Sequence, residues 1–186
     1  TNQPGTDPNK SDSDGDGHGD GKELSLGSDP TDSEVMPVVT KTSNAIVINE
    51  IHYDPEIANL PAEFIEIHNQ SDETVNLTDW KFSQAIEFIF PDVLLPPGEY
   101  LVVAQNLDTI LAEYGTNSLG PWQGKLSNEG ERIVLEDAAG KKIDEVDYGV
   151  NFPWPTAAQG EGPSMELIHP SLDNDLGGSW RSASTG

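Results

Sequence analysis

Short apolar runs, some alternating with polar residues and some continuous, begin near residue 45 and recur along the rest of the chain. Runs of this kind, bounded by Gly, Pro, Asn and Asp, are typical of β-strands. We predict strands at residues 45–53, 63–69, 74–77, 80–83, 87–90, 99–104, 132–137, 142–148 and 164–168. Turn residues between them, such as Pro96-Pro97-Gly98, provide the backbone angles that chain reversals require.

One segment has helical periodicity instead. Its apolar residues fall on one face of a helix: Leu107, Ile110, Leu111 and Tyr114. Asn106 or Asp108 can cap the start of this helix, and Gly115 can end it. Many short strands with one brief helix predict an all-β fold, an antiparallel β-sandwich or barrel.

The first part of the chain has a different composition. Asp, Gly, Ser, Pro and Thr predominate up to Asn44, and the large apolar side chains are too few for a core. The phrase Gly5-Thr6-Asp7-Pro8 recurs 22 residues later as Gly27-Ser28-Asp29-Pro30. We therefore predict an acidic repeat and linker at residues 1–43 and a β-domain at residues 44–186.

The net charge of the chain excludes some classes of binding partner. The chain has 33 acidic and 9 basic residues, for a net charge of −24. Such a surface repels nucleic-acid phosphates and anionic membranes. The sequence has no cysteine, which excludes disulfides and thiolate chemistry, and no apolar run of membrane-spanning length. Because the chain begins with Thr1 and not Met, we expect it to be cut from a longer precursor.

Acidic residues of the first part follow the spacing of a calcium-binding loop. The segment from Asp12 to Glu23 matches the pattern D-x-D-x-D-G-x5-E, with Gly17 at the sharp turn. The expected oxygen ligands are the side chains of Asp12, Asp14, Asp16, Asp20 and Glu23 and the carbonyl of His18. Carboxylates crowded in this way repel each other unless a cation lies among them, so we predict that the loop binds one Ca²⁺.

Residues 5–34, which include the repeated phrase, resemble the bacterial thrombospondin type 3 repeats. The resemblance implies that Asp7 and Asp29 are secondary calcium ligands and that the protein is secreted or on the cell surface. Gly27 and Pro30 interrupt any helix after Glu23, which disfavours a paired-helix EF-hand. A site with a Kd of about 10⁻⁴ M is filled outside a cell and empty in a cytosol, so we expect an extracellular or cell-surface location.

The second part resembles the bacterial form of the lamin tail domain over residues 44–183. The resemblance is carried by an ordered series of phrases at residues 46–55, 63–69, 75–80, 95–103, 130–135 and 162–167. It departs at Asp79, where Gly commonly precedes Trp80. The resemblance implies an immunoglobulin-like β-sandwich that serves as an accessory module, and it transfers no catalytic residues.

Two other functions are compatible with the sequence. Glu50, His52, Glu66 and His68 lie on two predicted strands and could converge on zinc in a metal-dependent hydrolase. The alternative is a carbohydrate- or peptide-binding module that uses Trp80, Trp122, Trp154 or Trp180. In that case we expect Trp80 in the core and Trp122 and Trp154, which lie among Pro and Gly, at the surface.

The sequence has no Ser-His-Asp signature and no phosphate-cradling glycine loop. Our prediction is therefore a non-catalytic, calcium-binding structural or adhesion module of a larger protein. Its expected partners are the other domains of that protein, with an extracellular glycan or protein as a further class.

Overall fold

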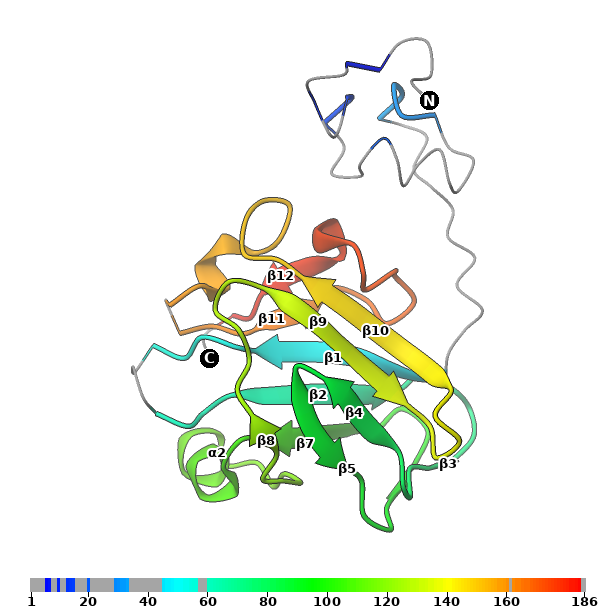
Figure 1. Cartoon of the computed structure of the whole chain (residues 1–186), viewed down its shortest axis with the longest axis vertical. Coiled ribbons are helices and arrows are strands. Elements are labelled where there is room, and N and C mark those ends of the chain that lie inside the picture. Colours follow the sequence, from blue (N-terminus) through cyan, green and yellow to red (C-terminus); the bar gives the residue numbers. More distant parts are fainter. Residues whose placement is uncertain are drawn as a thin grey trace. The chain divides into compact units, whose positions relative to one another are not determined.

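A computed structural model describes residues 6–7, 10, 13–15, 20, 29–33, 45–56, 60–160 and 162–184. The chain divides into two compact units, Thr1–Thr42 and Ser43–Gly186 (Figure 1). Within the described part of the chain, no helix has the length and apolar character needed to cross a membrane.

The second unit is built almost entirely from strands. They are β1 (Ile46–His52), β2 (Phe64–Asn69), β3 (Val75–Asn76), β4 (Lys81–Gln84), β5 (Ile86–Ile89), β6 (Leu94–Leu95), β7 (Tyr100–Ala104), β8 (Gln123–Gly124), β9 (Glu131–Glu136), β10 (Lys142–Tyr148), β11 (Met165–Leu167) and β12 (Trp180–Ser182). One α-helix, α2 (Leu107–Tyr114), and two 3₁₀ turns, η1 (Thr156–Ala158) and η2 (Gly177–Ser179), complete the unit.

The strands form two five-stranded sheets. The back sheet has the order β12-β11-β1-β2-β7 and the front sheet the order β10-β9-β4-β5-β8, while β3 pairs with β6 separately. In Figure 1, β9, β10 and β4 of the front sheet lie before β1 and β2 of the back sheet. Neighbouring strands pair antiparallel in both sheets and in the β3–β6 pair. The predicted all-β, immunoglobulin-like antiparallel sandwich with one short helix is confirmed.

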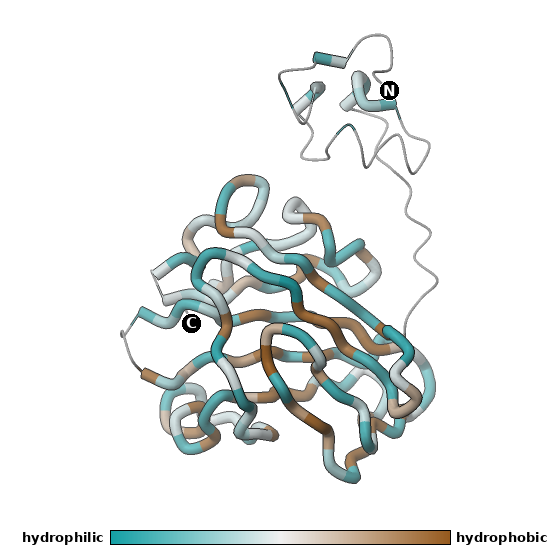
Figure 2. Tube along the Cα trace, in the orientation of Figure 1, coloured by the Kyte–Doolittle hydropathy of each residue, from teal (hydrophilic) through white to brown (hydrophobic). Residues whose placement is uncertain are grey.

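A β-bulge in β1 determines which side chains enter the core. The pairing of β1 with β2 shifts between Ile48 and Glu50, so that Asn49 is an extra residue. Ile48 and Ile51 therefore both point inward and are fully buried, although three positions separate them. Glu50 and His52 consequently lie on the outer face of the back sheet. Figure 2 shows the hydrophobic segments concentrated along the paired strands.

Helix α2 begins and ends as the sequence predicts. The Asn106 side chain accepts a hydrogen bond from the Thr109 N–H, and Gly115 ends the helix in the left-handed conformation (φ 66°). Its apolar face, however, is only partly buried. Ile110 packs against Phe64 and Ala104, whereas Leu111 and Tyr114 remain about half exposed, at 51% and 49%.

Asp79 occupies the turn at which the sequence departs from the family pattern. Its φ is 62°, in the left-handed region that glycine adopts most readily. Asp and Asn tolerate this region better than most residues, since their short polar side chains can bond locally. The turn therefore keeps the geometry that favours glycine, and its Trp80 N–H donates to the Leu77 carbonyl.

A buried carboxylate joins the two sheets. Asp144 of β10 is 3% exposed, and its Oδ2 accepts the Ile48 N–H of β1 at 2.7 Å. The Asn174 amide donates to the same Oδ2 at 2.7 Å and to the Ile48 carbonyl at 3.1 Å. Asn174 is held in turn by Trp180, whose indole N–H donates to the Asn174 carbonyl. The two sheets are thus linked by hydrogen bonds between β1 and β10 in addition to their shared core.

We expect Asp144→Ala to lower the free energy of unfolding by about 3 kcal/mol, because it leaves the buried Ile48 N–H and Asn174 amide without this acceptor. Urea denaturation monitored by tryptophan fluorescence measures the change. Asp72→Ala is the matched control, since Asp72 is exposed and should cost less than about 0.5 kcal/mol. Equal losses for the two variants would contradict the structural role of Asp144.

Candidate functional site

The structure describes four of the eight predicted calcium ligands. Asp20 accepts hydrogen bonds from Ser13, through the backbone N–H to Oδ1 and the hydroxyl to Oδ2, both at 2.7 Å. The Asp7 N–H donates to the Ser13 hydroxyl at 2.9 Å. Asp29 instead accepts bonds from the N–H and hydroxyl of Thr31 in its own turn. Asp14 is the fourth; the remaining predicted ligands lie outside the described residues: Asp12, Asp16, His18 and Glu23.

Three glutamates form a row across the outer face of the back sheet. Glu50 of β1 is paired with Glu66 of β2 on one side and with Glu166 of β11 on the other. Side chains of directly paired residues lie about 5 Å apart at Cβ, so the three carboxylates are neighbours. Asn49 donates to Glu66 at 3.0 Å and Ser164 donates to Glu50. Arg181 of β12 pairs with Glu166 at 3.1 Å.

Burial and mutual repulsion act on these carboxyls. The pKa of Glu50 is raised from 4.5 to about 7, chiefly by burial and to a smaller extent by the charges of Glu66 and Glu166, while the Ser164 hydrogen bond lowers it. Burial likewise raises the pKa of Glu66, with a smaller contribution from Glu166. A positive charge placed beside the row would favour ionisation of these groups.

The two imidazoles of the proposed zinc site are not brought together. In the β1–β2 ladder, His52 lies opposite Phe64 and His68 opposite Val47, at separate ends of the strands. His52 contacts the carbonyls of Ala62 at 3.1 Å and Gly162 at 2.9 Å. Burial lowers the pKa of His52 and that of His68.

His68 contacts the Glu99 carbonyl at 3.2 Å and stacks on Tyr100 with ring centroids 4.2 Å apart. Across the described ranges, no group of three His, Asp or Glu residues is arranged to hold a metal ion. The antiparallel register therefore places Glu50 beside Glu66 but keeps His52 and His68 at opposite ends of the two strands.

A pocket of about 250 Å³ opens beside Glu50. Glu50, Glu166 and Ser164 supply its polar groups, and the rings of His52, Phe64 and Tyr114 form an aromatic wall. The three rings meet edge to face, with centroids 5.2, 5.7 and 6.0 Å apart. A second hollow of about 190 Å³ shares Glu50, Phe64 and Tyr114 and extends to Glu66 and Val102.

Sequence reasoning singled out Glu50, His52 and Glu66 but missed Tyr114, Ser164 and Glu166 as neighbours. Tyr114 comes from α2, and Ser164 and Glu166 come from β11 and the residue before it, more than 100 residues away from β1 in the chain. The only available signal was alternation on the strand at 164–168, which places Glu166 on the face opposite Met165 and Leu167.

The tryptophans are mostly internal. Trp122 and Trp180 are only 6% and 4% exposed, and both belong to the main core. Trp154 is partly buried and packs against Trp180 with ring centroids 6.1 Å apart. Trp80 packs against the core, as expected. The prediction that Trp122 lies at the surface is therefore wrong, because its ring packs into the main core. Phe152, at 79%, is the exposed aromatic residue of the 152–155 loop.

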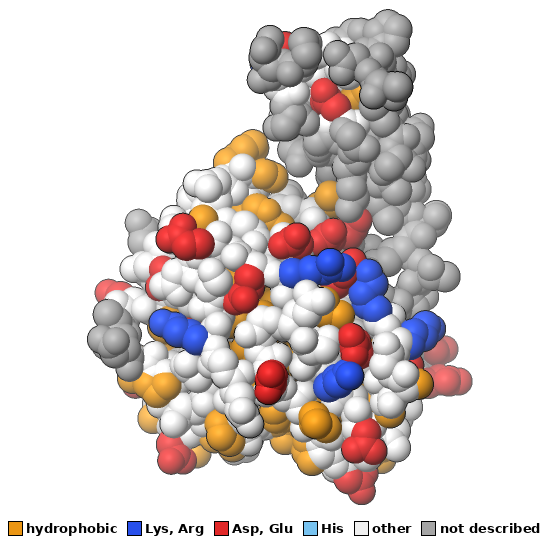
Figure 3. Space-filling model, viewed as in Figure 1, with side chains coloured by type: hydrophobic (Ala, Val, Ile, Leu, Met, Phe, Trp, Pro, Cys, Tyr) orange, Lys and Arg blue, Asp and Glu red, His pale blue; other side chains and the backbone are white. Residues whose placement is uncertain are grey.

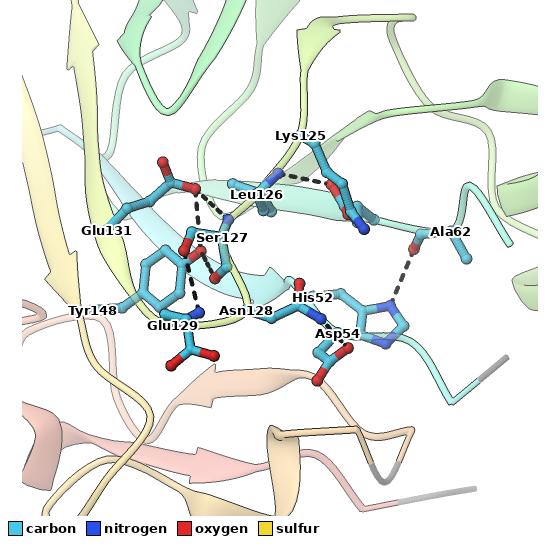
Figure 4. A network of polar contacts seen from close by, with 11 residues as sticks. His52, Asp54, Ala62, Lys125, Leu126, Ser127, Asn128, Glu129, Glu131 and Tyr148 are labelled. Carbon is cyan, nitrogen blue, oxygen red and sulfur yellow. Dashed lines mark hydrogen bonds and ion pairs between the residues drawn. The ribbon is translucent and has the colours of Figure 1, made fainter. Parts of the chain in front are cut away.

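A second polar network holds the segment before β9 (Figure 4). Glu63 is only 1% exposed; its Oε2 accepts the Leu126 N–H at 2.9 Å and its Oε1 lies 3.7 Å from the Lys125 ammonium. The Tyr148 hydroxyl donates to the Ser127 carbonyl at 2.8 Å. Burial raises the pKa of Glu63 from 4.5 to about 7. These contacts fix the loop that enters β9, which is a structural role.

This raised pKa predicts a pH dependence of stability. Between pH 4.5 and 7 the folded state binds more protons at Glu63 than the unfolded chain does, so stability falls as pH rises through this window. We expect Glu63→Gln to reduce that fall by about 2 kcal/mol, because a neutral amide carries no desolvated charge. Urea denaturation at a series of pH values from 4.5 to 8 measures the free energy of unfolding of both proteins.

Glu87→Gln is the control for this experiment, since Glu87 is exposed on β5 and its removal should leave the profile unchanged. A Glu63→Gln profile that parallels that of the unsubstituted protein would show that the buried carboxyl does not titrate in this range.

Comparison with known families places the β-domain. The family model of the Lamin Tail Domain matches residues 40–150, a stretch that contains β1 to β10 and α2. No curated protein matches the chain. The family has a non-enzymatic, immunoglobulin-like fold, in agreement with the two antiparallel sheets described above. Because the match covers more than half of the chain, the protein belongs to the lamin tail domain family.

Proposed function

We propose that this protein is a non-catalytic structural or adhesion module of a larger bacterial secreted or cell-surface protein, and that Ca²⁺ orders the segment before its β-sandwich. The proposed calcium binding rests on the spacing of the acidic residues between Asp12 and Glu23, which matches a calcium-binding loop. Membership of a structural family supports the non-catalytic part.

Contacts among the described residues of the first unit are compatible with a closed loop. Asp20 holds position nine of the motif and bonds to Ser13 at position two, seven residues earlier. Asp7, a predicted secondary ligand, reaches the same Ser13 hydroxyl through its N–H. These bonds draw positions that are distant in the loop toward one another, as a loop that wraps around an ion requires.

The energetics favour a role in ordering the segment. With a Kd of about 10⁻⁴ M and about 2 mM free Ca²⁺, linkage contributes about 1.8 kcal/mol to the folded state of the loop. That is sufficient to order a short segment that has few apolar residues. The same affinity leaves the loop empty at cytosolic calcium concentrations, which supports an extracellular location.

The arrangement of the β-domain supports a structural role. His52 and His68 are each engaged with backbone carbonyls, and their registers keep them apart. Trp122 and Trp180 are in the core, which removes two of the four proposed glycan-stacking faces. In this proposal the protein has a mechanical role: the calcium-ordered spacer is rigid and sets the distance between the sandwich and the preceding domain.

Calorimetric titration of the full chain tests the calcium part. We expect one site with a Kd on the order of 10⁻⁴ M, and Asp14→Ala should weaken it at least about tenfold, because a hard oxygen ligand is lost. Asp32→Ala is the control, since Asp32 lies outside the twelve-residue motif and should leave the affinity unchanged. Absence of heat at millimolar Ca²⁺, with no change in the amide NMR signals of residues 12–23, would refute the proposal.

A further inference from the structure

Basic residues are distributed unequally between the two sheets of the β-domain. Five of its six Lys and Arg residues lie in the front sheet or next to its strands: Lys81, Lys125, Arg132, Lys141 and Lys142. Several are paired there, as Lys81 is with Glu136 and both Arg132 and Lys142 are with Glu145. Figure 3 shows this face, where basic and acidic side chains are interspersed.

The outer face of the back sheet has the opposite character. Among the described residues, one basic side chain accompanies its row of Glu166, Glu50 and Glu66: that of Arg181, which pairs with Glu166 at the edge of the row. Glu50, at the centre, accepts a hydrogen bond from the Ser164 hydroxyl, a neutral donor. Within the described part of the chain, Glu50 and Glu66 form no ion pair with Lys or Arg, and both lie at half-buried positions where charge is poorly solvated.

The pocket beside Glu50 has walls suited to an organic cation. On one side are the carboxylates of Glu50 and Glu166; on the other are the rings of Phe64 and Tyr114. Aromatic faces and edges accept aliphatic chains, and carboxylates attract the positive head. The volume, about 250 Å³, is below that of a pocket for a drug-sized ligand and is appropriate to one extended side chain.

The spacing of the carboxylates distinguishes between cations. The three carboxylates stand on three neighbouring strands, which lie about 4.8 Å apart. They therefore do not present two oxygens in one plane, as a planar cation requires. An ammonium group has three N–H donors that diverge, whereas a guanidinium group is a planar fork that matches a single carboxylate. The row therefore favours an ammonium head.

We propose that this pocket binds an aliphatic ammonium ion such as the side chain of a lysine, with the head between Glu50 and Glu166 and the methylene chain against Phe64 and Tyr114. A lysine of a partner polypeptide and a free alkylamine share this chemistry. The site is separate from the calcium loop and does not depend on it.

NMR titration of the ¹⁵N-labelled full chain tests the proposal, with Nα-acetyl-lysine N-methylamide as the probe. We expect saturable shifts of the amides of Ser164, Tyr114 and Glu50, with a Kd on the order of 1 mM. The norleucine analogue, which lacks only the ammonium group, should bind at least about tenfold more weakly. Equal binding of the two, or no shift at these amides, would overturn the proposal.

Matched variants separate the pocket from general attraction by an acidic protein. Glu50→Gln keeps the size and the Ser164 contact and should weaken binding about tenfold. Glu87→Gln makes the same charge change on β5 of the front sheet and should have no effect. If both variants weaken binding equally, the attraction is not specific to the pocket and the assignment fails.

Two further probes test which cationic group the pocket prefers and whether that group belongs to a polypeptide or to a free amine. The arginine analogue should bind more weakly than the lysine amide, and tighter binding by arginine would contradict the ammonium assignment. n-Butylamine tests the free amine: similar affinity to that of the amide supports a small amine, and markedly weaker binding supports a lysine within a polypeptide.

Binding should also depend on pH. The groups that face Glu50 are Glu66, Glu166, His52, Tyr114 and the hydroxyl of Ser164, with Arg181 beyond Glu166. Since burial raises the pKa of Glu50 to about 7, its charge develops between pH 6 and 8 and the lysine amide should bind more tightly as pH rises. An affinity that falls over this range would contradict the role of Glu50.

Discussion

The sandwich depends on the hydrogen bonds that the Asp144 carboxylate makes across its two sheets. Two sheets can share an apolar core and still slide relative to each other, because hydrophobic contacts have little directionality. Asp144 of β10 accepts the backbone N–H of Ile48, and Asn174 bonds to both residues, which sets the position of β10 against β1. A buried carboxylate is costly unless it is fully bonded, so this arrangement disfavours other alignments of the sheets.

The bulge at Asn49 follows directly after this junction and decides the chemistry of the outer face. Without the extra residue, strict alternation after Ile48 would place Glu50 in the core. With it, Ile51 returns to the interior and Glu50 lies outside beside Glu66 and Glu166. One local irregularity in β1 therefore produces both an uninterrupted apolar interior and a row of acidic side chains, which Tyr114 and Phe64 enclose on one side.

Most of the elements could be predicted because their signals are local. Alternation marked the long strands, and the Asn106 cap and Gly115 marked the ends of α2. The short strands β6, β8 and β12 were missed, since two or three residues are too few to show a period. Trp122 was misplaced for a different reason: neighbouring Gly and Pro indicate a turn but do not say whether the turn faces the solvent or the core.

The sequence by itself determined the longer strands, the helix and their order along the chain, the resemblance to the lamin tail domain, and the ligand spacing of the predicted calcium loop. Each of these is a pattern within a few residues, or an ordered series of such patterns. Only the tertiary structure decided that Glu50 and Glu66 meet Glu166, that His52 and His68 lie apart, and that Glu63 and Asp144 are buried. These facts depend on strand register and on contacts between segments that can be more than 100 residues apart in the chain. No local sequence pattern encodes such contacts.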